Sequence, residues 1–278
     1  MANPVFSSSP VFGDPHQRGN RGTVAAQTVD AARLEQMYNA PTATARDTGR
    51  LTYDDVIVRT GGLLALLVAV AAGTWWGTEA GVLPPGVWII GMVLGLVLGL
   101  VNAFKRTPSP ALIVAYSVAE GVFLGGISLA FTALTVEGSS AQPIVLQAVL
   151  ATMATFAASL WLYKSGRVRV TPKFTRWLLI ALVGYLGFQV VNIVLSFFVD
   201  SSGAFGPMRS GWIGVAVGLV AVGLAAASLI VDFDSIKRGV QAGVPKQFAW
   251  TAAFGLVVTL VWLYLEFLRL FAILSGRD

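Results

Sequence analysis

The chain lacks cysteine altogether and has one histidine, His16, among its 278 residues. Without thiols it forms no disulfide, and one histidine cannot supply the ligand sets of His-based zinc or haem sites. A rhomboid-like serine protease needs a histidine base inside the membrane, whereas His16 lies in a polar stretch rich in Ser, Pro, Gly and Asn. We therefore expect no cofactor, no tightly bound metal and no enzymatic activity.

Charge is also scarce, because 12% of the residues are charged whereas 55% are hydrophobic. Seven stretches exceed the roughly 18 apolar residues that cross a ~30 Å hydrocarbon core. We place the spans near 57–77, 86–104, 110–134, 143–163, 177–199, 211–233 and 249–274. No lysine occurs in 249–274, which excludes a retinal protein with a Schiff base in its last helix. The sequence predicts an all-α membrane protein, a bundle of seven transmembrane helices.

Lysine and arginine are distributed unequally between the predicted loops. Loops 105–109 and 164–176 are rich in them, loops 78–85 and 135–142 have none, and the loop before the sixth span has Arg209 alone. Positive loops stay in the cytoplasm, so we expect a cytoplasmic amino terminus and a carboxyl terminus outside. The net charge of +5 then reflects the membrane surface and anionic lipid, and we expect no nucleic-acid partner.

The chain divides into two parts by composition. Residues 1–50 have no apolar run and two Pro-containing, Ser-rich patches, which predicts a disordered cytoplasmic tail. Residues 51–278 form the seven-helix transmembrane domain. Within it, Gly91, Gly95 and Gly99 share one helix face, a spacing that allows close helix packing. We favour packing within one chain over dimerisation, and so favour a monomer.

Three acidic residues lie in or beside apolar runs, where a charge costs roughly 2.5 to 3.5 kcal/mol. Glu120 lies ten residues after Pro110, or about 15 Å along the third span, too deep for its side chain to reach interface water. Asp232 follows some twenty apolar residues of the sixth span. Glu266 lies in the seventh span, where Arg269 at i+3 is a candidate ion-pair partner. Each acid is therefore a candidate functional residue.

The fifth span has a stripe of polar residues along one side. Tyr185, Gln189, Asn192 and Ser196 follow one another at helical spacing and must face protein or water rather than lipid. Hydrogen bonding between helices and the lining of a hydrated pathway explain this stripe equally well.

Three segments resemble the Bax inhibitor family of seven-helix membrane proteins, in a prokaryotic-type form. They are Val231-Asp232-Phe233 with Ser235-Ile236-Lys237, Leu263-Tyr264-Leu265-Glu266-Phe267 with Leu270-Phe271, and Tyr116 to Gly121. Members look like pH-sensitive calcium leak channels in which two acids of helices six and seven share a proton. The resemblance implies that Asp232 and Glu266 form this pair in a prokaryotic plasma membrane.

Helix geometry leaves the partner of Asp232 open. With a hairpin turn near residue 243, straight helices place Glu266 and Asp232 about 18 Å apart in depth, whereas Glu120 lies near the expected depth of Asp232. Two close carboxylates in a low-dielectric site cannot both ionise cheaply, so whichever acid meets Asp232 would titrate with it as a pair. Ionised carboxylate oxygens are also hard ligands that suit calcium.

Three hypotheses remain. The first is a calcium or other cation leak channel, in which Asp232, Glu120 and Glu266 line or gate the path and protons modulate it. The second is a non-transporting membrane protein that regulates stress responses or protein turnover, with structural acids. The third is a proton-coupled transporter, which the lack of proline inside the spans disfavours.

Overall fold

The computed structural model describes residues 49–105, 107–133, 144–198 and 206–275. The helices are α3 (Tyr53–Glu79), α4 (Val87–Phe104), α5 (Pro110–Ala133), α6 (Ile144–Lys164), α7 (Pro172–Ser196), α8 (Gly211–Gln241), the short 3-10 helix η2 (Lys246–Phe248) and α9 (Ala249–Leu274). All seven α-helices are long and apolar enough to cross a membrane. The predicted seven-helix membrane fold is confirmed. The tail predicted for 1–50 lies almost wholly outside the described residues.

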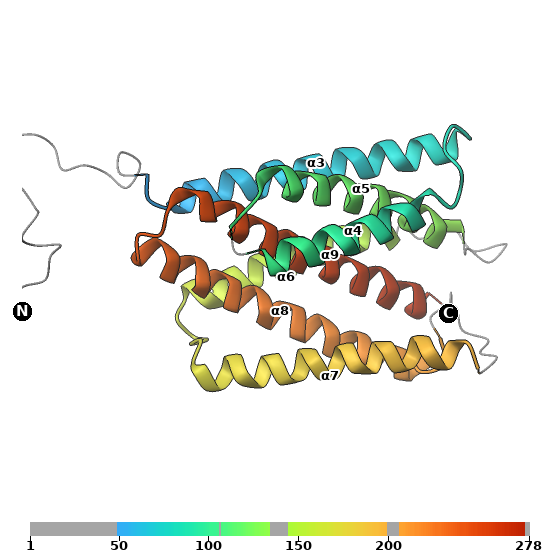
Figure 1. Ribbon diagram of the computed structural model, residues 1–278. Helices are drawn as coiled ribbons and strands as arrows, with labels where there is room; N and C mark the ends of the chain where they lie inside the picture. The colour runs from blue at the N-terminus through green and yellow to red at the C-terminus, as the bar shows by residue number, and fades with distance from the viewer. Residues whose placement is uncertain (1–48, 106, 134–143, 199–205, 276–278) are drawn as a thin grey trace, which may run out of the picture. The chain divides into compact units, whose positions relative to one another are not determined.

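Consecutive helices run in opposite directions, so their connections gather at two ends (Figure 1). We call the end where α8 turns into α9 the Lys246 end, and the end where α7 turns into α8 the Arg209 end. At the Lys246 end the backbone nitrogen of Leu51 donates to the Val244 oxygen (2.8 Å), and that of Lys246 donates to the Gly49 oxygen (2.9 Å). The entry to α3 is thereby fixed to the α8–α9 turn.

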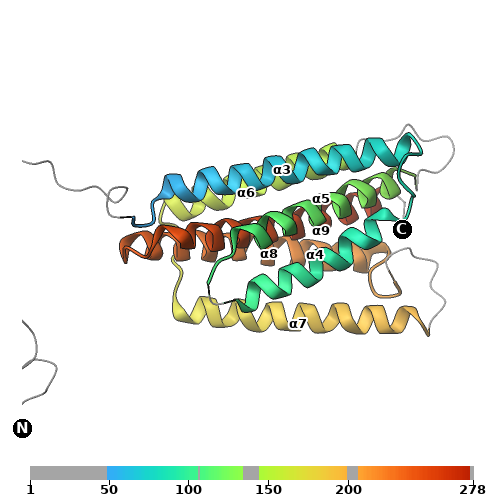
Figure 2. The same cartoon turned by 45° about the horizontal axis from the view of Figure 1, so that its top comes forward.

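Helix α9 runs through the middle of the bundle (Figures 1 and 2). It packs against α3, α5, α6 and α8, and it is the most extensively buried of the seven helices. Helix α4 packs mainly on α5 and α7 mainly on α8, and these two leave most of their surface exposed. Without a membrane, this exposure of apolar side chains would be costly, whereas in a bilayer those faces meet lipid.

Close glycine contacts hold α4 against α5. A Cβ on Gly91 would lie 2.6 Å from the backbone nitrogen of Phe123, and one on Gly95 would lie 2.7 Å from Oε1 of Glu120. Because small residues let helix backbones approach, the glycine face of α4 is occupied within the chain. The prediction of packing inside one chain is confirmed for this face.

Candidate functional site

Asp232 lies on the face of α8 that meets α9. Its Oδ2 accepts a hydrogen bond from the hydroxyl of Thr259 at 2.9 Å, and the same hydroxyl lies 3.1 Å from the carbonyl oxygen of Gly255. One hydroxyl proton is thus shared between two acceptors. Among the described residues no lysine or arginine forms an ion pair with Asp232, which is partly buried between the two helices. This carboxylate therefore has one weak neutral donor.

Its neighbour in sequence, Asp234, has a different environment. Asp234 forms an ion pair with Arg238 one turn later and accepts a hydrogen bond of 3.3 Å from the hydroxyl of Tyr163. The Arg238 side chain is 60% exposed, so this pair belongs to the surface of the Lys246 end. The two acids of α8 point to different surroundings, as their spacing predicts.

Glu120 lies on α5 opposite the glycine face of α4. It is 8% exposed, and its Oε2 is one of the buried oxygens for which the described residues provide no hydrogen-bond partner. Tyr116, one turn earlier on α5, is its side-chain neighbour. Ser117 is fully buried on the same helix, and its hydroxyl likewise has no partner among the described residues. Unsatisfied buried oxygens are costly, so these two are candidates for contact with water or an ion.

Glu266 of α9 is held by positive and polar donors instead. Its Oε2 lies 2.9 Å from Nη2 of Arg209 and also pairs with Arg269, as the i+3 spacing predicts. Tyr185 donates its hydroxyl proton to Oε1, and Nε1 of Trp262 lies 3.2 Å from the same oxygen. Two guanidinium groups therefore neutralise a single carboxylate at the Arg209 end.

Arg209 is the residue of this cluster that sequence reasoning missed. It precedes α8 by two residues, yet its side chain is 1% exposed and its guanidinium also stacks over Tyr185, 5.6 Å from the ring centroid. A signal was present: it is a lone basic residue in a loop, and Glu266 lies eight residues before the end of α9 at the same end of the bundle. A long side chain that turns back along the helices spans that depth.

The polar stripe of α7 contacts protein over much of its length. Tyr185 reaches Glu266, and Oδ1 of Asn192 accepts a hydrogen bond of 3.0 Å from the backbone nitrogen of Met208. Gln189 has a buried Oε1 without a partner among the described residues, whereas Ser196 is exposed and bonds to its own helix. The stripe thus positions the Arg209 segment, and its role in lining a pathway stays a prediction.

The three acids are not brought together. Asp232 lies at the level of Thr259, and Glu266 follows Thr259 by seven residues, which is about 10 Å along α9. Glu120 faces α4 on the other side of α5. The pairing of Asp232 with Glu266 that the resemblance implies is therefore not found, nor is a contact of Asp232 with Glu120. Among the described residues, no group of three or more His, Cys, Asp or Glu side chains could hold a metal ion.

Comparison with known proteins places the chain in one family. A family model described as Bax inhibitor 1 like matches residues 3–276, which is nearly the whole length. A search of curated proteins found no match. The seven apolar helices agree with this match, and the matched range includes the three segments around Glu120, Asp232 and Glu266. The chain is therefore a member of the Bax inhibitor 1 like family.

Proposed function

We propose that this chain is a calcium-permeable cation leak channel whose flux depends on pH. One observation carries the proposal: Asp232 and Glu120 are carboxylates inside membrane-crossing helices, and no described lysine or arginine pairs with either. A carboxylate at that depth costs several kcal/mol unless it is protonated, solvated or bound to a cation. Ionised carboxylate oxygens are hard ligands of the kind calcium takes. A cation that passes either carboxylate would therefore offset the cost of its buried charge.

The three acids take different roles in this proposal. Asp232 and Glu120 attract the cation, and protons compete with the cation for the same oxygens. Glu266 is neutralised by Arg209 and Arg269, so it fastens the α7–α8 connection to α9 and takes no part in attracting cations. Glu266 therefore stabilises the helices around the cation path, whereas the resemblance places it in the path itself.

The proposed setting follows the distribution of basic loops. The Lys246 end faces the cytoplasm, because the helix ends and connections there hold Lys105, Lys164 and Arg238. The Arg209 end faces the outside of a prokaryotic plasma membrane. We further propose that one chain is sufficient, because the glycine face of α4 is occupied by α5 of the same chain.

Purified protein in liposomes tests the function. With a calcium-sensitive dye trapped inside, wild-type protein should admit calcium faster than protein-free liposomes, at a rate that changes between about pH 5 and 8. No flux above the protein-free control at any pH would refute the channel and favour a non-transporting regulator. Flux that requires an imposed proton gradient, instead of responding to pH on both sides, would favour a proton-coupled transporter.

A further inference from the structure

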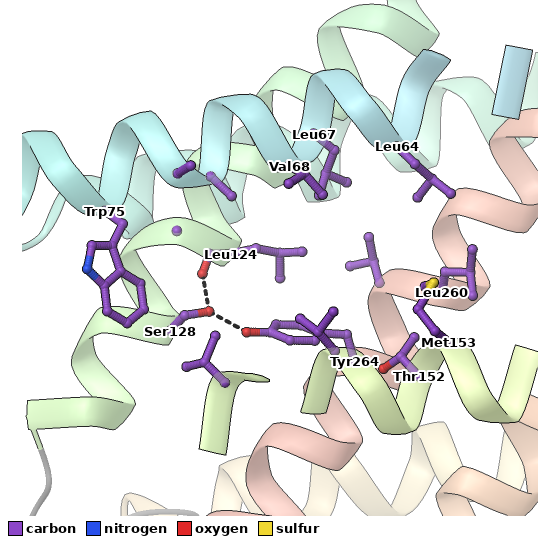
Figure 3. Close-up of a pocket in the computed structure, with 16 residues that line it drawn as sticks. Leu64, Leu67, Val68, Trp75, Leu124, Ser128, Thr152, Met153, Leu260 and Tyr264 are labelled. Carbon is purple, nitrogen blue, oxygen red and sulfur yellow. Dashed lines mark hydrogen bonds between the residues drawn. The ribbon is translucent and has the colours of Figure 1, made fainter. Parts of the chain in front are cut away.

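A large apolar cavity lies between four helices in the Arg209 half of the bundle. It has a volume of about 410 Å³ and is bounded by α3, α5, α6 and α9 (Figure 3). Its walls are mostly aliphatic, with Leu67 and Val68 of α3 on one side and Val149 and Met153 of α6 on the other. An engineered apolar cavity of about 150 Å³ already binds benzene, so a space of this size is suited to a ligand.

The few polar atoms in the wall are already bonded. The hydroxyl of Ser128 lies 2.7 Å from that of Tyr264 and also donates to the backbone oxygen of Leu124 (Figure 3). The hydroxyl of Thr152 donates to the backbone oxygen of Ala148 at 2.7 Å. Water needs two to four polar partners to occupy a cavity, and these hydroxyl groups already donate their protons within the protein, which leaves only a few acceptor lone pairs for a water molecule. A wall with so few free polar groups favours a hydrocarbon occupant.

Access to the cavity is from the side of the bundle. Val68 is 62% exposed and Met153 is 45% exposed, although both line the cavity, so their helices flank an opening on the lipid-facing surface. Trp75 lines the same cavity near the end of α3, and its Nε1 donates a hydrogen bond of 3.2 Å to Glu79 at the last turn. A tryptophan with a polar partner is typical of the boundary between hydrocarbon and headgroups.

We propose that this cavity holds one acyl chain of a membrane phospholipid, which enters between α3 and α6 and leaves its headgroup near Trp75. An acyl chain in the bilayer is already out of water, so the gain comes from packing: a vacant cavity forfeits the dispersion contacts of its walls, and a chain that fills the cavity restores them. The bilayer that surrounds these helices supplies such chains at high concentration. Neither Asp232 nor Glu120 lines this cavity, so lipid binding can be tested separately from calcium flux.

Native mass spectrometry of purified protein, reconstituted with a phospholipid of one defined composition and then diluted into detergent, tests the site. Wild-type protein should retain one phospholipid per chain. Val68→Trp, which fills the cavity from its α3 wall, should lower retention about tenfold. Val58→Trp is the matched control, because Val58 is 72% exposed on the same helix and does not line the cavity, and it should retain the lipid.

A second measurement does not depend on whether the filled variant folds. Phospholipids brominated along the acyl chain quench nearby tryptophans, and quenching that persists after dilution into detergent reports a retained chain. Trp75→Phe should remove most of this persistent quenching, whereas Trp76→Phe should not, because Trp76 is 69% exposed and lies outside the cavity. Absence of retained lipid in the wild type, equal retention in both valine variants, or a dimer whose partner covers the cavity would each overturn the proposal.

Discussion

The three acids inside the membrane-crossing helices fall into two groups that differ in what surrounds their carboxylates. Glu266 has two arginines and two further donors on its oxygens, and it joins the segment before α8 to the central helix. Asp232 has one shared hydroxyl, and Glu120 has an oxygen without a partner among the described residues. A buried carboxylate with strong partners is fixed in charge and place, whereas one without them must change with its surroundings. The first group supports the fold, and we propose that the second serves transport.

Removal of the Glu266 carboxylate should have the largest effect on stability. Glu266→Leu leaves the buried guanidinium of Arg209 without its counter-charge, and we expect a loss of about 3–5 kcal/mol in the free energy of unfolding. Thermal unfolding in detergent measures this. The double variant Glu266→Leu/Arg209→Met should recover most of the loss, because it removes both fully buried charges and leaves only Arg269, whose side chain is 16% exposed. If the single and double variants were equally destabilised, the ion pair would not be the reason for the stability of this region.

Substitution of the α4 glycines that face α5 should have an intermediate effect on stability. Gly91→Ala should destabilise the protein by about 1–3 kcal/mol, because the added Cβ would meet the backbone of α5 and force the helices apart. Gly95→Ala should cost less stability, since its Cβ meets the mobile end of Glu120, but it should alter calcium flux. Gly62→Ala is the control, because an added Cβ meets nothing within 4 Å there. Equal losses for all three variants would contradict the proposed contacts.

Removal of the hydrogen bond between Thr259 and Asp232 should have the smallest effect on stability. Thr259→Val removes the hydroxyl, and we expect about 0.5–1.5 kcal/mol of destabilisation, the usual net worth of one such bond. Calcium flux should persist, because the carboxylate itself remains. Thermal unfolding and the liposome assay report the two quantities separately. A loss of flux as complete as that of an Asp232 variant would mean that Thr259, rather than the carboxylate alone, forms part of the cation path.

The sequence predicted what depends on local periodicity and missed what depends on how helices meet. Seven apolar runs, the glycine spacing of Gly91 and Gly95, and the Arg269 partner of Glu266 follow from contacts three or four residues apart. The Arg209–Glu266 pair joins residues 57 positions apart, and no local pattern encodes it. The partner of Asp232 was open for a similar reason: α8 continues to Gln241 and a 3-10 turn follows, and these features set which residue of α9 lies opposite.

Calcium flux in liposomes that carry Asp232→Asn or Asp234→Asn tests the central claim most directly. The two substitutions are chemically the same and lie two residues apart on α8, but Asp234 is paired with Arg238 at the surface whereas Asp232 faces α9. With equal amounts of folded protein, Asp232→Asn should abolish most of the flux and its dependence on pH, and Asp234→Asn should leave both close to wild type. Unchanged flux and pH dependence in Asp232→Asn would contradict the account.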